Sequence, residues 1–208
     1  MNLKLKHMKF KKITSILAES YNGNSMSVFD IDDTLVVTSA KIKVYDPLSG
    51  DEFSLTPAQY NDYERKPQHK LDFTEFDDGD ILLKGRPIEW VVKILVNTMK
   101  KQKAVGIITA RGDKQIILDF LNKHGININP AFVFAIGDPK SKYTGDNAQK
   151  KQQAFEDLIA MGFKDFKFFD DNLENLKYAK ELEKKYSDVK VITKHIQSKW
   201  IPKFEDEQ

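Results

Sequence analysis

Short apolar segments alternate with longer segments of helical periodicity along most of this 208-residue chain. The segments expected to form strands are residues 25–30, 104–108, 132–136, 166–169 and 189–192. Those expected to form helices are residues 87–100, 113–124, 149–161 and 173–186. Strands that alternate with helices of about ten or more residues are typical of a parallel sheet with helices on both faces. The pattern therefore predicts an α/β fold, a three-layer sandwich around a central, mostly parallel sheet.

The ends of the predicted helices carry residues that commonly mark helix boundaries. Pro87 is expected in the first turn of the first of these helices, where its missing N–H costs nothing. Gly125 and Gly162 stand where the second and third helices should end, since glycine readily adopts the conformation of a C-terminal cap. A further short surface helix is expected at residues 10–20.

One long stretch, residues 37–84, interrupts this alternation. It contains prolines, glycines and short β-like pieces such as residues 41–45, and it carries nine acidic but only three basic residues between positions 51 and 80. A loop of this length inside a compact domain usually has a function or a small fold of its own. We therefore expect one domain over residues 1–208, with 37–84 as an inserted flap or small cap beside the carboxyl edge of the sheet. A surface hairpin without function is the alternative.

The composition excludes several classes of protein. Hydrophobic residues make up 40% and aromatic residues 11% of the chain, which is enough for a buried core and too much for a disordered protein. No apolar run approaches the roughly 18 residues of a membrane span. The chain has no cysteine, which excludes disulfides and thiolate zinc ligands, and its net charge of +2 does not indicate nucleic-acid binding. A reducing cytoplasm is the simplest location for such a chain, and its oligomeric state stays open.

Carboxylates directly follow the first predicted strand. Asp30 and Asp32 leave this strand in an Asp-x-Asp pattern that can point both side chains into one crevice. Open parallel sheets bind their ligands at the carboxyl ends of the strands. Two carboxylates in such a place repel each other unless a cation lies between them, and hard oxygen ligands favour Mg²⁺. The alternative is an acidic turn or helix cap without chemistry.

Further polar residues occur at other predicted strand ends and at a helix start. The tripeptide Thr109–Arg111 follows the second strand, where a hydroxyl, an amide N–H and a cation suit phosphate oxygens. A helix N-cap is the alternative for this turn. Lys150 and Lys151 open a helix, and either of them can reach back to neutralise charge; a solvated lysine is the alternative for each. Asp170 and Asp171 follow the fourth strand as a second carboxylate pair.

These four elements, in this order, resemble the motifs of the haloacid dehalogenase superfamily. The first motif, an apolar strand followed by Asp-x-Asp-x-Thr, matches residues 28–36, and the second, a Ser or Thr that closes an apolar strand, matches Thr109. The third, a lysine at a helix start, is best matched by Lys151, with Lys150 as the alternative. The fourth is the acidic pair at 170–171. The resemblance covers roughly residues 25–195 and implies the Rossmann-like fold of that superfamily.

The resemblance also implies roles for these residues. Asp30 is expected to attack the phosphorus atom and to carry an aspartyl-phosphate intermediate. Asp32 is expected to act as general acid and then as general base. Lys151 is expected to balance charge in the transition state. The residues expected to bind the phosphoryl group are Thr109, Ala110, Arg111 and Lys151, and those expected to bind Mg²⁺ are Asp30, Asp32 through its backbone carbonyl, Asp170 and Asp171.

The function implied is a Mg²⁺-dependent phosphatase that acts on a nucleotide or another small phosphomonoester. A phosphomutase is an alternative, whereas dehalogenases lack the second aspartate of the first motif. The Thr-x-Arg turn and the spacing from the lysine to the acidic pair are also similar to the 3′-phosphatase domain of polynucleotide kinase–phosphatases. A 3′-phosphatase that acts on nucleic-acid ends is therefore another alternative, although an acidic insertion repels a nucleic-acid backbone. A catalytically silent binding protein of the same fold is the non-enzymatic alternative. Tyr60 and Tyr63 are expected to fill the core of the insertion rather than to stack on a substrate.

Overall fold

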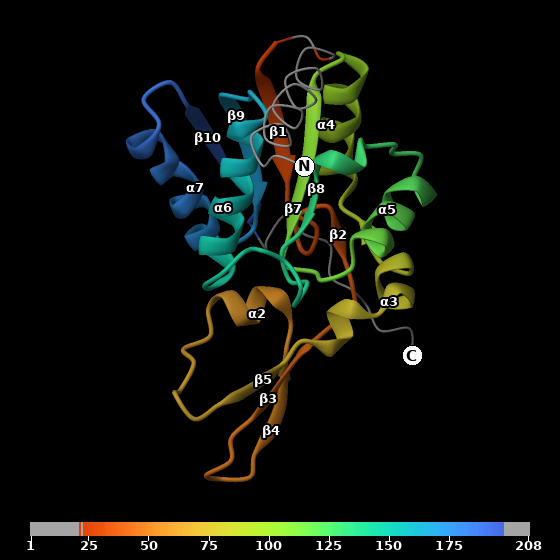
Figure 1. The fold of residues 1–208 in the computed structure, drawn as a ribbon. Coiled ribbons are helices and arrows are strands. Elements are labelled where there is room, and N and C mark those ends of the chain that lie inside the picture. Colours follow the sequence, from red (N-terminus) through yellow and green to blue (C-terminus); the bar gives the residue numbers. More distant parts are fainter. Residues whose placement is uncertain (1–20, 22, 198–208) are drawn as a thin grey trace, which may run out of the picture.

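A five-stranded parallel sheet forms the centre of the fold (Figure 1). The computed structural model describes Tyr21 and residues 23–197. The strands of the sheet are β1 (Ser25–Phe29), β7 (Ala104–Thr109), β8 (Val133–Ala135), β9 (Asp165–Asp170) and β10 (Lys190–His195). Their spatial order is β10-β9-β1-β7-β8, and every neighbouring pair is parallel. The predicted α/β architecture with a central parallel sheet is confirmed.

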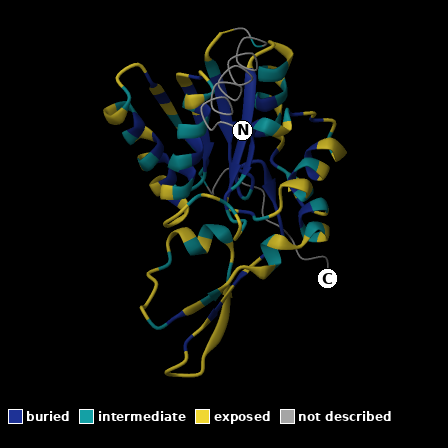
Figure 2. Ribbon diagram, in the orientation of Figure 1, coloured by how far each residue is buried: buried dark blue, intermediate teal, exposed yellow. Residues whose placement is uncertain are grey.

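Helices cover both faces of this sheet. They are α4 (Glu89–Lys100), α5 (Lys114–Lys123), α6 (Asn147–Ala160) and α7 (Leu173–Lys185). Successive residues of β1 point to opposite faces, as in any strand. Phe29 packs in one apolar core with residues of α4 and α5, and Val28 packs in a second core with residues of α6 and α7. All residues of β7 are buried, as expected for a strand covered on both faces (Figure 2).

Every strand and helix expected between residues 25 and 192 is present, with ends that differ by three residues or fewer; β10, for example, runs to His195 and α6 begins at Asn147. Gly125 and Gly162 have positive φ angles of 69° and 104° and follow α5 and α6, as predicted. Pro87 lies outside α4, in the short strand β6 (Arg86–Pro87), so its placement in the first helical turn is wrong. It pairs with Val36 of β2 (Val36–Val37), which keeps the backbone extended up to Ile88. The helix expected at 10–20 lies outside the described residues.

Residues between β2 and β6 form a small substructure beyond the carboxyl edge of the central sheet (Figure 1). We call residues 37–84 the insertion. Its sheet has the antiparallel order β4-β3-β5. Its elements are β3 (Ile42–Tyr45), β4 (Glu52–Leu55), α2 (Pro57–Asn61), β5 (Lys70–Asp72), the 3₁₀ helix η1 (Thr74–Asp77) and α3 (Gly79–Leu83). The three helical pieces have four or five residues each, which is too short to give a periodic sequence signal.

Local sequence nevertheless explains why α2 forms where it does. The Thr56 side chain accepts a hydrogen bond from the Gln59 backbone N–H, and the Gln59 side chain accepts one from the Thr56 N–H. This reciprocal pair satisfies two N–H groups that the start of a helix otherwise leaves unpaired. Pro57 occupies the first helical position, where it needs no hydrogen bond. The turn therefore stays fixed although it buries none of its residues fully.

The insertion has a polar interior of its own. His69 is buried, and its Nε2 lies 3.1 Å from Oδ2 of buried Asp46. The Tyr63 hydroxyl hydrogen-bonds Nδ1 of the same imidazole, and Phe53 packs edge-on against both rings. Tyr63 therefore fills the core of the insertion, as expected. Within residues 23–197 and Tyr21, no helix has the length and apolar character needed to cross a bilayer.

Candidate active site

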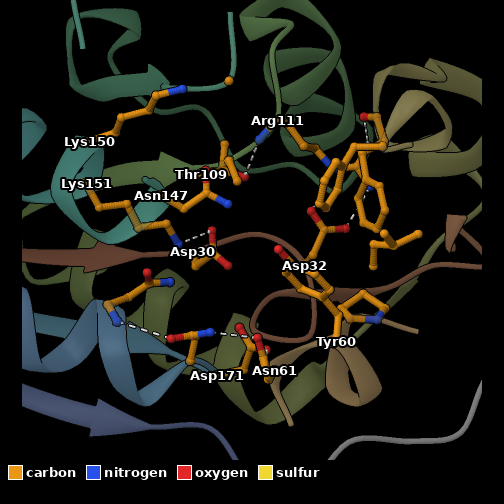
Figure 3. Close-up of a pocket in the computed structure, with 18 of the residues that line it drawn as sticks. Asp30, Asp32, Tyr60, Asn61, Thr109, Arg111, Asn147, Lys150, Lys151 and Asp171 are labelled. Atoms are coloured by element: carbon orange, nitrogen blue, oxygen red, sulfur yellow. Dashed lines mark hydrogen bonds and ion pairs between the residues drawn. The ribbon is translucent and has the colours of Figure 1, made fainter. Parts of the chain in front are cut away.

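The polar residues predicted at the strand ends meet at one edge of the central sheet (Figure 3). Phe29 at the end of β1 is in register with Ile107 of β7 and with Phe169 of β9. Asp30, Thr109 and Asp170 follow these positions by one or two residues. Because the three strands run parallel, these side chains emerge at the same level. The edge thus gathers groups that are far apart in the sequence: Asp30 and Thr109 are separated by 79 positions.

Lys151 lies at the centre of this group. It is only 2% exposed, and its Nζ lies 3.0 Å from Oδ1 of Asp30 and 2.7 Å from Oδ2 of Asp170. Lys151 comes from the first turns of α6, which begins after an Asp146 cap. The neighbouring Lys150 lines the same cavity but makes no such contact. The structure therefore places Lys151, and not Lys150, between the two carboxylates.

The acidic pair after β9 is held by its own loop and by the insertion. Oδ1 of Asp170 accepts hydrogen bonds from the Asn172 backbone N–H and from Asn175 Nδ2, both at 2.9 Å. Oδ2 of Asp171 accepts one from Nδ2 of Asn61 at 2.6 Å. Asp170 is fully buried, so its three polar partners offset the cost of burying its charge.

Burial and mutual repulsion shift the pKa values of these groups. Removal from water raises the pKa of Asp30 to about 7; Lys151 opposes this rise, while Asp170 and Asp32 add to it. Burial and the neighbouring Asp170 hold the pKa of Asp171 well above its usual range. Burial favours the neutral amine of Lys151, but Asp170 and Asp30 together outweigh it and raise the pKa of this lysine. The site therefore carries more negative charge than one ammonium group balances.

Three carboxylates at this edge can hold a metal ion. Asp30, Asp170 and Asp171 each present an oxygen within 4.8 Å of the other two. Oδ1 of Asp30 is buried, and the Lys151 ammonium is its ion-pair partner. One ammonium group does not balance three carboxylates, so a metal ion bound by them would offset the remaining negative charge. The Asp32 carboxylate is not part of this cluster.

Asp32 instead pairs with Arg111. Nε and one terminal nitrogen of Arg111 donate to the two oxygens of Asp32 at 2.9 Å and 2.7 Å. Another terminal nitrogen donates to the Phe76 backbone oxygen at 2.5 Å, so Arg111 links the first strand end to the insertion. The guanidinium was expected to bind a phosphoryl oxygen, but it is 2% exposed and bound to a carboxylate. Arg111 thus lines the cavity as the partner of Asp32.

The turn after β7 is shaped by a close backbone contact. Thr109 is buried, and its Oγ1 accepts a hydrogen bond from the Arg111 backbone N–H at 3.3 Å. Ala110 is exposed to the cavity. A Cβ atom at Gly137 would lie 2.0 Å from the Ala110 carbonyl oxygen, so only glycine fits there. Sequence reasoning missed Gly137, because nothing in the local pattern shows which backbone it will meet.

The insertion closes the other side of a cavity of about 320 Å³. Tyr60 and Asn61 of α2 line it on that side, and Asn61 lies beside Asp171 (Figure 3). Tyr60 was expected in the core of the insertion, and this expectation is wrong: its ring lines the cavity and packs edge-on against Phe73. The reason is that the small core of the insertion is filled by Tyr63 and its neighbours, which leaves α2 facing the sheet.

Several cavity residues carry no sequence motif. Asn147 of α6 and Asn175 of α7 lie among the polar residues of the wall, while Phe73 and Phe76 come from the insertion. Neither asparagine has a capping role that sequence could reveal, because Asp146 and Asn172 are the N-caps of α6 and α7. The aromatic residues could not be located, because their position depends on how the insertion folds over the sheet.

Comparison with known proteins gives little further information. No family model matches the sequence, and no curated protein matches it. Among solved structures, a hypothetical protein from Xanthomonas campestris is similar over 84% of this chain, with 15% sequence identity and a TM-score of 0.34. This chain spans 66% of the length of that protein.

Proposed function

We propose that this protein is a Mg²⁺-dependent phosphomonoester hydrolase of the haloacid dehalogenase type. The observation that carries the proposal is the position of the buried Lys151 ammonium between Asp30 and Asp170, at the edge where β1, β7 and β9 end. Phosphoryl transfer depends mainly on positioning and on charge stabilisation. A nucleophilic carboxylate, a fixed cation and a second carboxylate group at one sheet edge supply both.

The reaction has two steps at Asp30. A carboxylate oxygen of Asp30 attacks phosphorus, the bond from phosphorus to the leaving oxygen breaks, and the leaving group departs with a proton. Water then attacks the phosphorus of the aspartyl phosphate and releases inorganic phosphate and the free carboxylate. The ammonium of Lys151 stabilises the charge on the phosphoryl oxygens, while the Thr109 hydroxyl and the Ala110 N–H bind them from the neighbouring strand end.

Asp30, Asp170 and Asp171 are the residues that would hold the metal ion. Oxygen ligands of this kind suit Mg²⁺, which neutralises phosphate charge when it is bound. Because these carboxylates outnumber the nearby ammonium group, they need a further positive charge, which a metal ion would supply. Asn61 hydrogen-bonds Asp171 and fixes its orientation from the side of the insertion.

Asp32 is the group that moves protons in this scheme. Its carboxylate lines the cavity next to Asp30. Each carboxylate oxygen has two lone pairs, so the hydrogen bonds from Arg111 leave a free acceptor position on both. Arg111 therefore positions Asp32 for proton transfer to the leaving oxygen and then from water. This assignment gives Arg111 a role toward Asp32 rather than toward phosphate.

Hydrolysis of 4-nitrophenyl phosphate tests the proposal, with Mg²⁺ and with EDTA, in the wild-type protein and in Asp30→Asn. We expect turnover that requires Mg²⁺ and falls by about 10³-fold or more in the variant, as for a missing nucleophile. Asp165→Asn is the matched control, because Asp165 is exposed at the opposite end of β9. Turnover that persists in EDTA, or that Asp30→Asn retains, overturns the proposal.

A further inference from the structure

The walls of the cavity differ sharply in chemistry. The central fold supplies most of the polar groups, namely carboxylates, ammonium groups, a guanidinium, amides and a hydroxyl, and the insertion adds Asn61 and Asp77 to them. The apolar contribution of the central fold is limited to one alanine and two glycines. The insertion supplies every larger apolar side chain on the cavity wall. These are Ile42, Pro57, Tyr60, Phe73 and Phe76. Reaction chemistry and apolar contact therefore come from two different parts of the chain.

The aromatic residues of this wall form a connected group. The rings of Tyr60 and Phe73 pack edge to face, with centroids 5.5 Å apart and an interplanar angle of 86°. Phe76 lies 6.3 Å from Phe73, and the Arg111 guanidinium lies 5.5 Å from the centre of the Phe76 ring. These contacts hold the rings in place. A preformed aromatic surface binds a flat partner at a low entropic cost.

This aromatic group is partly exposed and is separate from the core that Tyr63 and His69 form within the insertion. Phe73 is 40% exposed. Phe53 is equally exposed but packs against Tyr63 and His69, away from the cavity. In Figure 3 the Tyr60 ring lies across the cavity from Lys150 and Lys151. An aromatic ring that borders a charged cavity and is not part of the core of the insertion can contact a ligand.

We propose that the leaving group of the substrate carries a planar aromatic ring, which packs against Tyr60 and Phe73 while its phosphoryl group lies at Asp30. This inference rests on the proposed phosphatase function. The volume of about 320 Å³ is at the lower end of small-molecule sites and suits one ring system with its phosphate. The nine acidic residues between positions 51 and 80 disfavour a polyanionic strand.

Two phosphonates test ring binding without hydrolysis, because their carbon–phosphorus bond replaces the ester. Phenylphosphonate and methylphosphonate differ only in the group that would face the insertion. In the presence of Mg²⁺, titration calorimetry should show about tenfold tighter binding of phenylphosphonate, as expected for one aromatic contact. Phe73→Leu should abolish this preference, whereas Phe53→Leu should keep it. Equal affinities in the wild type, or an unchanged preference in Phe73→Leu, overturn the inference.

Turnover then identifies the source of the ring. A nucleoside 5′-monophosphate is compared with ribose 5-phosphate, and benzyl phosphate with cyclohexylmethyl phosphate, so that the leaving oxygen is alike within each pair. We expect kcat/KM to be about tenfold higher for the ring-bearing member of at least one pair. The pair that shows the preference identifies a nucleoside or a simple aryl substrate.

The outcomes separate this inference from the proposed function. Turnover without a ring preference in either pair overturns the inference and leaves the phosphatase standing. Tight phenylphosphonate binding that depends on Phe73, but no turnover of any phosphomonoester, overturns the phosphatase and supports an aromatic anion site. Failure of both phosphonates to bind, together with turnover of ribose 5-phosphate, also contradicts the inference.

Discussion

The sheet edge and the insertion contribute to one cavity but are built differently. At the sheet edge, Lys151, Asp170 and Thr109 are each 2% exposed or less, and they are tied to neighbours by ion pairs and hydrogen bonds. The insertion is built from strands of three or four residues and helical pieces of four or five, with many exposed side chains (Figure 2). Parallel register fixes the polar groups of the sheet edge, whereas short helical pieces of the insertion carry the aromatic residues that line the cavity: Tyr60 in α2, Phe76 in η1 and Phe73 at the start of η1.

If the proposed function holds, the sheet edge carries out the reaction and the insertion determines which substrate is preferred. A change at the sheet edge disturbs buried charges, which are expensive to leave without partners. A change at a partly exposed residue of the insertion, such as Phe73, removes surface that faces the cavity and leaves the buried charges of the sheet edge paired. We therefore expect substitutions at the edge to reduce all turnover and to lower stability, and those in the insertion to change substrate preference. The following predictions test that division, from the largest expected effect to the smallest.

Replacing the buried lysine should have the largest effect. Lys151→Met leaves Asp30 and Asp170 without their ammonium partner. We expect kcat/KM for 4-nitrophenyl phosphate to fall by about 10²–10³-fold and stability to fall by about 3 kcal/mol. Lys150→Met is the matched control, and it should change stability by less than about 0.5 kcal/mol. Similar losses of activity and stability in the two variants would contradict the assignment of Lys151.

A methyl group at Gly137 should displace the turn after β7, to which we assign phosphate binding. The added Cβ would lie 2.0 Å from the Ala110 carbonyl oxygen, so the turn after β7 must move. A shift of about 1 Å at a catalytic group commonly costs about 10²-fold in rate. Steady-state kinetics should show this loss in Gly137→Ala but not in Gly79→Ala, where the new atom meets only the flexible Ile116 side chain. Equal, small effects would show that the turn does not depend on this contact.

Mg²⁺ should stabilise the protein more at high pH than at low pH. In the metal-free protein, burial raises the Asp30 pKa to about 7, above its ordinary value of 3.8. Between these values the folded state holds a proton that the unfolded state has lost, so stability falls as pH rises. A cation binds the ionised carboxylate and recovers that stability. Thermal unfolding should therefore show a larger Mg²⁺-induced rise in Tm at about pH 8 than at about pH 5.5, and the reverse order would contradict a metal site at Asp30.

The smallest effect should be confined to the insertion. Tyr63→Phe removes the hydroxyl that bonds His69 and should cost about 1 kcal/mol locally. Amide hydrogen exchange should then become faster in β3 and β5 but stay unchanged in β1 and β7, because the central sheet does not contact this hydroxyl. Tyr45→Phe serves as the control, since Tyr45 is exposed on the same small sheet. Faster exchange throughout the protein would show that the two regions unfold together.

The central sheet was the part most open to prediction from sequence. Continuous apolar runs such as Ala104–Thr109 and glycines such as Gly162 locate strands and helix ends because they reflect local conformational preference. The strand-end positions of Asp30 and Thr109 followed from the fold class, since parallel strands end at one edge. The choice between Lys150 and Lys151 needed coordinates, because both positions fit the helix start.

The insertion was the part least open to prediction. Its helices have five residues or fewer. Among its strands only β3 has a clear alternating pattern, which agrees with the β-like piece expected at residues 41–45. Tyr60 and Tyr63 stand three residues apart, yet one faces the cavity and the other fills the core. The pairing of Arg111 with Asp32 joins residues 79 positions apart. Such contacts depend on how distant segments pack, which no local pattern records.

The most direct test of the account is to locate the phosphoryl group during turnover. The protein is mixed with Mg²⁺ and 4-nitrophenyl phosphate, quenched in acid, reduced with borohydride and analysed by peptide mass spectrometry. An acyl phosphate is reduced where it formed, so the account predicts the reduced residue at Asp30 and none in Asp30→Asn. Turnover without any modified aspartate, or with the modification at Asp32 or Asp170, would contradict it.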